Sequence, residues 1–193
     1  MVSSNGGSER ASAPSGGSIF STWPQALFAV CEIFDPATET WTRTTDLQVP
    51  RVHFEMAALP NGEVLAFGGH PAGMSPQELL PDDHSELFDP ATGTWSLAAP
   101  MLLNRWALDG LTAVLPSGKV LVAGGQHGNH DDLDTWQRTA SVELFDPADG
   151  RWHEGPALRA GRDWQALVVL SYGRVMAVGG AGYGHEETEY WTP

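Results

Sequence analysis

The sequence Leu115-Pro-Ser-Gly-Lys-Val-Leu-Val-Ala-Gly-Gly125 joins a tight turn, a short apolar run and a double glycine. Proline and glycine near its start are typical of a β-turn, because glycine adopts positive φ at little steric cost. The run Val120–Ala123 contains no polar residue, which suits a short strand that is buried on both faces. The double glycine allows a sharp exit and a close approach of another backbone. The stretch therefore predicts a turn followed by a buried β-strand.

The same pattern occurs three times along the chain. Phe-Asp-Pro is found at 34–36, 88–90 and 145–147, and a Trp lies seven residues after each Phe. An Arg follows each Trp by ten residues, with 54 residues from Arg51 to Arg105 and 57 from Arg105 to Arg162. We predict that the recurring positions are structural; they are Trp41, Trp95, Trp152, Arg51, Arg105, Arg162, Gly68, Gly69, Gly124, Gly125, Gly179 and Gly180.

Each repeat contains four short segments with strand character, and none has a long helical period. This predicts an all-β fold of four-stranded antiparallel units, the pattern of β-propeller blades. The predicted blades span about 40–88, 94–145 and 151–191, and an extra strand lies at about 27–34. The extra strand and the chain end at 189–193 both align with the fourth strand of a unit. Residues 1–18 are expected to form a disordered Ser/Gly-rich leader, and 19–193 the propeller segment.

These features resemble the kelch-repeat family of β-propellers over about residues 27–193. The resemblance extends to the galactose oxidase and glyoxal oxidase group, which has short sequence motifs similar to Arg105-Trp106 and Leu115–Gly125. In that group a Cys on one blade is cross-linked to a Tyr after an Arg-Trp pair, and this Tyr, a second Tyr and two His bind copper. Here Ala107 takes the Tyr position, His53-Phe54 lies where the Cys would be, and Cys31 is on a different strand. We therefore expect no catalytic residue, metal or cofactor in this chain.

Three blades are too few to close a ring, since propellers have about four to eight. An open wedge would expose apolar blade faces to water. Two explanations stay open. The chain is a segment of a longer propeller, or two copies pair as a homodimer that forms a six-bladed ring.

The loops that follow the double glycines are the predicted binding surface, because equivalent loops of a propeller gather on one face. The candidate residues in or beside them are His70, His84, Trp106, His127, His130, Asp131, Asp132, Trp136, Tyr183 and His185. His and carboxylate groups could bind a divalent cation, but their spacing fits no calcium loop or other metal motif. We expect solvated acidic loops that bind a protein or a small molecule.

The chain has 193 residues, 10 basic and 24 acidic side chains, and a net charge of −14. This acidity argues against nucleic-acid binding, and no apolar run is long enough to span a membrane as a helix. The single cysteine excludes an intrachain disulfide. No signal peptide is evident, which slightly favours the cytoplasm and leaves the compartment open. We predict a non-catalytic binding scaffold; the alternatives are the propeller part of a copper oxidase with its catalytic parts elsewhere, and a structural half-propeller dimer.

Overall fold

A computed structural model of the chain describes residues 29–71, 83–106, 108, 110–128, 137–181 and 188–191. This part is all-β, as predicted, and its only helical element is a short 3-10 turn at Ser171–Gly173. The predicted leader, residues 1–18, lies outside the described residues. Among the helices of the described part, none has the length and apolar character needed to cross a membrane.

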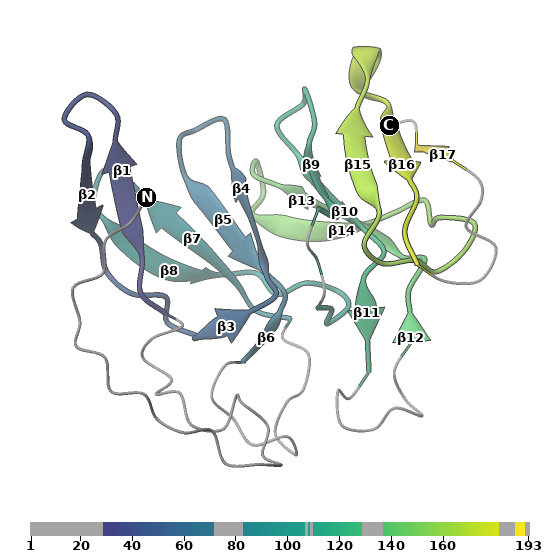
Figure 1. The fold of residues 1–193 in the computed structure, drawn as a ribbon, viewed down its shortest axis with the longest axis horizontal. Helices are drawn as coiled ribbons and strands as arrows, with labels where there is room; N and C mark the ends of the chain where they lie inside the picture. Colours follow the sequence, from purple (N-terminus) through teal and green to yellow (C-terminus); the bar gives the residue numbers. More distant parts are fainter. Residues whose placement is uncertain are drawn as a thin grey trace, which may run out of the picture.

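Four antiparallel sheets follow one another along the chain and form a fan, from the purple to the yellow end of the ribbon (Figure 1). The N-terminal hairpin consists of β1 (Glu32–Asp35) and β2 (Thr40–Arg43). The first blade consists of β4 (Glu55–Ala58), β5 (Val64–Phe67), β7 (Ser85–Asp89) and β8 (Thr94–Ala98). The second blade consists of β9 (Thr112–Val114), β10 (Val120–Ala123), β13 (Val142–Asp146) and β14 (Arg151–Gly155). The C-terminal sheet consists of β15 (Ala166–Val169), β16 (Val175–Val178) and β17 (Glu189–Trp191).

Two short ladders lie together beyond one end of the blades (Figure 1). One pairs β3 (Arg51–Val52) with β6 (His70–Pro71), and the other pairs β11 (Gln126–His127) with β12 (Gln137–Arg138). We call this end of the molecule the loop face. It is the end at which the chain leaves each double glycine.

The sheets divide the strands differently from the predicted blades. The Trp95 strand is the fourth strand of the first blade, where Phe88 pairs with Trp95, and not the first strand of the next unit. The physical reason is the tight turn between them, in which the Gly93 amide donates to the Asp89 carbonyl at 2.8 Å. So short a turn joins neighbouring strands of one sheet. The predicted ranges 40–88, 94–145 and 151–191 therefore each begin one strand too early.

The same shift applies at both ends of the described chain. The predicted extra strand at 27–34 corresponds to β1. It pairs with the Trp41 strand β2 in the way that β7, the third strand of the first blade, pairs with β8, the fourth. The strand β17 pairs with β16 and is likewise a third strand. The N-terminal hairpin thus has third and fourth strands, and the C-terminal sheet has the first three.

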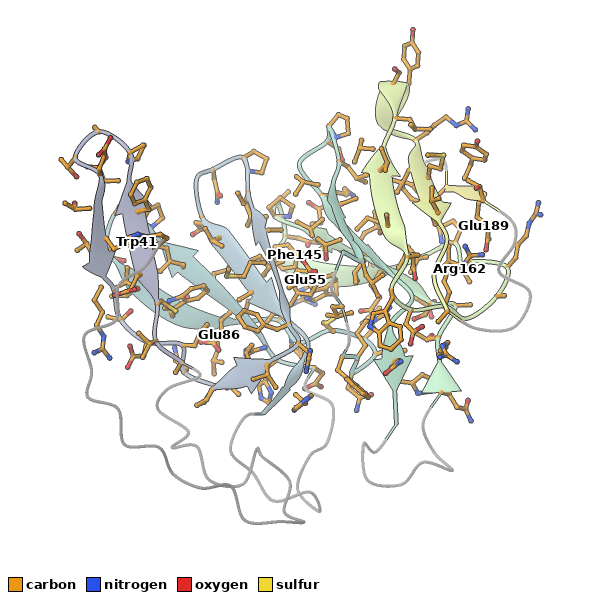
Figure 2. The ribbon with its side chains drawn as sticks, viewed as in Figure 1. Trp41, Glu55, Glu86, Phe145, Arg162 and Glu189 are labelled. Atoms are coloured by element: carbon orange, nitrogen blue, oxygen red, sulfur yellow. The ribbon has the colours of Figure 1, made fainter. Side chains whose placement is uncertain are left out.

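The main core lies between the two complete blades. The four residues of β10 are all buried, as expected for a strand covered on both faces. The ring of Trp152 packs between Phe67 of the first blade and Phe145 of its own, with centroid distances of 5.0 and 5.4 Å. By contrast, 62% of the Trp41 surface is exposed on the N-terminal hairpin (Figure 2).

The double glycines connect each blade to the next. The Gly69 amide donates to the Arg105 carbonyl at 2.9 Å, and the Gly125 amide donates to the Arg162 carbonyl at 2.9 Å. Both glycines have positive φ, 85° and 94°. A side chain at Gly124 would collide with the Arg162 carbonyl, so this close approach requires glycine.

Candidate functional site

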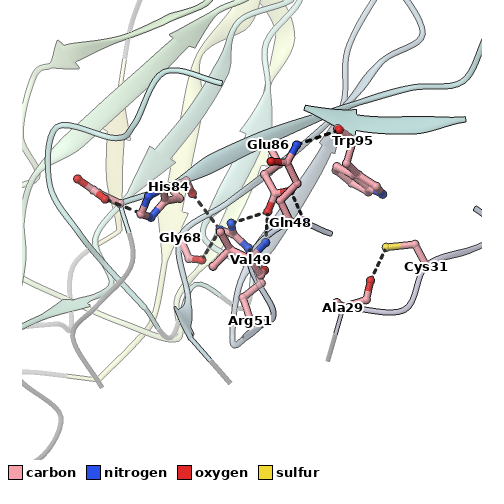
Figure 3. A network of polar contacts seen from close by, with 10 residues as sticks. Ala29, Cys31, Gln48, Val49, Arg51, Gly68, His84, Glu86 and Trp95 are labelled. Atoms are coloured by element: carbon pink, nitrogen blue, oxygen red, sulfur yellow. Dashed lines mark hydrogen bonds and ion pairs between the residues drawn. The ribbon is translucent and has the colours of Figure 1, made fainter. Parts of the chain in front are cut away.

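Each repeat anchors the base of the loop face with a buried arginine. The Arg51 guanidinium donates to the carbonyls of Gly68 and His84 at 3.1 and 2.9 Å, and it forms an ion pair with Glu86 at 2.9 Å (Figure 3). Both charged side chains are fully buried. The guanidinium thereby satisfies the two carbonyls that flank the loop.

The other two repeats use the same arrangement. Arg105 donates to the carbonyls of Gly124 and Ser141 at 2.8 and 3.1 Å and pairs with Glu143. Arg162 donates to the Gly179 carbonyl at 3.4 Å and pairs with Glu189, as Figure 2 shows at the C-terminal sheet. The recurring arginines therefore hold the double glycine and the return strand together.

The glutamates extend this network to the segment that enters each blade. Glu86 accepts hydrogen bonds from the Gln48 and Val49 amides at 2.7 and 3.2 Å. Glu143 accepts from the Leu102 and Leu103 amides at the same two distances. Neither glutamate is among the positions predicted from the sequence, although each lies two residues before the aromatic residue of the third strand. A search for recurrence at that offset would have found them.

An aromatic cluster lies on this anchored base. The rings of His53 and His70 have a centroid distance of 5.6 Å, and both lie near Trp106, at 6.4 and 5.8 Å. Trp106 is 8% exposed, whereas His53 is exposed and His70 is half-buried. We call these three residues the aromatic cluster. Two of its members, His70 and Trp106, are among the predicted site residues, and the third, His53, is not.

A polar group adjoins the aromatic cluster through the backbone. The amides of Trp106 and Gln126 each donate to the carbonyl of the other residue, at 2.9 and 3.1 Å. The Gln126 side chain donates to the Asp163 carboxylate, which also accepts from Arg138 at 2.8 Å. Gln126 and Asp163 are buried, so this group fixes the second repeat against the third.

His127 follows Gln126 on the loop face. Partial burial lowers the pKa of the His127 imidazole from its ordinary value, and the charge of Arg105 lowers it further. The imidazole is therefore neutral over a wider pH range than an ordinary histidine. A neutral imidazole both donates and accepts a hydrogen bond, which suits recognition of a polar ligand.

The second residue after the anchoring arginine is strained in two repeats. His53 and Trp164 have positive φ, 54° and 53°, which is uncommon for residues other than glycine. Strain of this kind is concentrated at functional sites. Trp164 is also 60% exposed. It follows Asp163, which forms an isolated antiparallel β-bridge with Ala181. Neither residue recurs in type, so the repeat pattern alone gave no reason to select it.

The structure describes four of the ten predicted site residues. It brings His70 and Trp106 together, and it places His127 after the bridge to Trp106. The His84 side chain is exposed beside Asp83, at 3.6 Å, while its carbonyl accepts from Arg51. Outside the described residues lie His130, Asp131, Asp132, Trp136, Tyr183 and His185. Within the described residues, no group of three or more His, Cys, Asp or Glu side chains is arranged to hold a metal ion.

Residues 109–159 match the Kelch motif, and they contain the whole second blade. The second blade is thus similar to a kelch repeat. The matched residues include Gly124, Gly125 and Trp152, three of the positions that recur along the chain.

Kelch relatives include proteins of different kinds. The chain is 30% identical over 120 residues to an F-box/kelch-repeat protein of Arabidopsis thaliana, which covers 62% of this chain and 28% of that protein. It is 27% identical over 125 residues to kelch-like protein 25 of Xenopus tropicalis, 62% of this chain and 19% of the relative. It is 27% identical over 164 residues to a galactose oxidase of Gibberella zeae, 77% of this chain and 20% of the enzyme. The chain thus spans less than a third of each of these relatives.

Proposed function

We propose that this kelch chain is a non-catalytic binding module whose ligand surface is the loop face. One observation carries the proposal: three buried Arg–Glu anchors fix the base of the loop face, and side chains that do not recur lie on that base. A rigid scaffold with variable residues at its loops is the usual basis of recognition by a repeat protein.

The chemistry of the surface favours a protein segment or small molecule with a planar or apolar group. Trp164 offers an exposed indole, and the aromatic cluster offers His53 and His70 with an indole beneath them. Tryptophan is enriched at binding hot spots because it buries a large area with little loss of conformational freedom. The net charge of −14 further favours a partner that carries basic groups.

The test is selection from a random 12-residue peptide library, followed by measurement of each selected peptide against variants of the chain. We expect Trp164→Ala to weaken binding at least about tenfold, as removal of a hot-spot residue does. Tyr172→Ala is the matched control, because Tyr172 is 98% exposed in the turn Ser171–Gly173 at the other end of the blade. Two results would contradict a ligand site on the loop face. In one, both variants weaken peptide binding equally; in the other, neither variant weakens it.

A second candidate function is favoured by the match to galactose oxidase: the chain would be the propeller part of a copper oxidase whose catalytic parts lie outside it. The local residues do not support a copper site, because Ala107 replaces the Tyr and Cys31 directly precedes β1, far along the chain from Arg105-Trp106. A copper titration of a longer protein that contains this segment together with such catalytic parts separates the two candidates, because the segment alone lacks copper ligands in both. Stoichiometric Cu²⁺ binding together with hydrogen peroxide production from galactose would favour the oxidase.

The propeller itself also needs completion. Sequence beyond this chain, or a second copy of it, would supply the strands that the N-terminal hairpin and the C-terminal sheet lack. In either case the chain acts as a scaffold segment whose open edges bind further β-strands.

A further inference from the structure

Residues at equivalent positions of neighbouring repeats contact each other on the loop face. His70 directly follows the double glycine of the first repeat, and its ring packs against Trp106, which directly follows the anchoring arginine of the second repeat. Gln126 and Asp163 hold the same two positions one repeat later, and there the amide of Gln126 donates to the carboxylate of Asp163. The same contact is thus aromatic between the first and second repeats and polar between the second and third.

Arg138 joins the polar contact from strand β12 of the loop face (Figure 1). Its Nε atom donates to the Asp163 carboxylate at 2.8 Å, and Gln126 donates to the same carboxylate. Asp163 is fully buried, and Gln126 is 2% exposed. The guanidinium is therefore held from below by a desolvated carboxylate, which orients it before any ligand arrives.

The outer part of the Arg138 guanidinium has no hydrogen-bond partner among the described residues. A guanidinium carries five N–H donors, and here the one on Nε is used. The side chain is 38% exposed, although its partner Asp163 is buried. Arg43, by contrast, binds the exposed Asp46 through Nη2, at 3.0 Å to both carboxylate oxygens. Arg138 thus offers a terminal fork of N–H groups on Nη1 and Nη2, and such a fork matches the two oxygens of a carboxylate.

Arg138 and the aromatic cluster lie at the two ends of one row of side chains. Gln126 pairs with Arg138 in the β11–β12 ladder, and on its other side it forms a backbone bridge with Trp106. Residues that pair directly across antiparallel strands point to the same face of the ladder. Because neighbouring strands are about 5 Å apart, the backbones of Trp106 and Arg138 are separated by roughly 10 Å. One compact ligand can therefore reach both ends of the row.

We propose that Arg138 binds a carboxylate group of the ligand, and that the aromatic cluster accepts a planar group of the same molecule. The carboxylate receives two parallel hydrogen bonds from Nη1 and Nη2, while Asp163 keeps its bond to Nε. This inference rests on the proposed function and deepens it, because it names a chemical group that the loop face recognises. The carboxylate can come from a peptide chain end, an acidic side chain or a small organic acid, and defined probes distinguish these sources.

The charges around Arg138 are compatible with a bound carboxylate. The net charge of −14 repels anions at long range, but at physiological salt this repulsion is largely screened beyond about 8 Å. A carboxylate at Nη1 and Nη2 is closer to the guanidinium than to Asp163, so its attraction to Arg138 exceeds its repulsion from Asp163. Basic groups elsewhere in the same ligand would meet the acidic remainder of the chain.

Nuclear magnetic resonance titration of the full chain tests the site with defined probes. N-acetyltryptophan carries a carboxylate and an indole, and N-acetyltryptophanamide is its neutral counterpart. We expect the acid to bind at least about tenfold more tightly than the amide, because hydrogen bonds between charged groups are stronger than neutral ones. The peptide acetyl-Asp-Ala-Trp-amide presents a side-chain carboxylate, and indolepropionate is a small acid without a peptide group. The tightest of the three acids identifies the source of the carboxylate.

Variants at exposed arginines connect the preference for the acid to Arg138. Arg138→Gln should abolish the difference in affinity between the acid and the amide, because the charge and the fork are both lost. Arg138→Lys keeps the charge but not the fork, and it should lose most of the preference. Arg43→Gln is the matched control and should leave the preference unchanged, since Arg43 is on the N-terminal hairpin. Circular dichroism checks that the variants fold, and both positions are exposed.

Three results would overturn the proposal. In the first, no carboxylate probe binds more tightly than the amide, whether all of them bind or none does at millimolar concentration. In the second, Arg138→Gln keeps the preference for the acid. In the third, Arg138→Lys keeps it in full, which would indicate attraction by charge without the fork. If any of these results appears while Trp164-dependent peptide binding persists, the carboxylate site alone is refuted, whereas loss of that peptide binding refutes the proposed function.

Discussion

Replacing Arg105 by methionine would remove the central anchor of the second blade. Arg105 donates to the Gly124 carbonyl, to the Ser141 carbonyl and to the Ser141 hydroxyl at 2.8, 3.1 and 2.7 Å, and it pairs with Glu143. The variant would leave the Glu143 carboxylate buried, with only the Leu102 and Leu103 amides as donors. Two buried carbonyls would also lose a donor.

The expected loss follows from the desolvation of both charges. Burial lowers the pKa of the Arg105 guanidinium, and the Glu143 carboxylate offsets only part of that effect. The ion pair therefore depends on its hydrogen bonds, and removal of one partner leaves an uncompensated charge. Such a change costs about 3–5 kcal/mol of unfolding free energy. For a chain of this length it corresponds to a fall in melting temperature of roughly 6–20 °C.

Urea unfolding followed by tryptophan fluorescence measures the change. Arg43→Met is the control, since the Arg43–Asp46 pair is exposed and its loss costs less than about 1 kcal/mol. The double variant Arg105→Met/Glu143→Leu should regain about 1–2 kcal/mol over the single variant, because no charge remains buried. The reasoning is refuted if Arg105→Met matches the parent within about 1 kcal/mol, or if the double variant is the less stable of the two.

Two further predictions concern the loop face and its support. The nuclear magnetic resonance titration of the His127 imidazole should have a midpoint below 6.5, because burial and Arg105 lower its pKa. Because the pKa of His127 is lower in the folded chain, the unfolded chain binds more protons, and the contribution of His127 to stability is present above pH 6.5 and is lost as the pH falls through the lowered pKa. His127→Gln should remove this pH dependence of stability. A midpoint at or above 6.5 contradicts the lowered pKa. Gly161→Ala should destabilise the chain and increase hydrogen exchange at β12, because the new methyl group would collide with the Arg138 carbonyl, whereas Ala160→Gly should not affect β12; unchanged exchange at β12 would show that the backbone yields at no cost.

The binding residues illustrate the limit of prediction from sequence. His70, Trp106 and His127 could be selected because histidine and tryptophan near the double glycines are distinctive types in predictable loops. His53 and Trp164 could not, since their importance comes from positive φ and from the neighbours that the fold brings to them. Glu86 and Glu143 recur in sequence, but only their burial beside arginine explains why they recur.

The sequence by itself determined the strands, the turns between them and the repeated pattern that resembles kelch repeats, because apolar runs, glycine turns and the spacing of repeats act over a few neighbouring residues. The tertiary structure alone decided which strands share a sheet. The Arg51–Glu86 and Arg105–Glu143 pairs join residues 35 and 38 positions apart, and the Gly125–Arg162 bond joins two different sheets. Such partners are set by the packing of whole sheets, which no local pattern specifies.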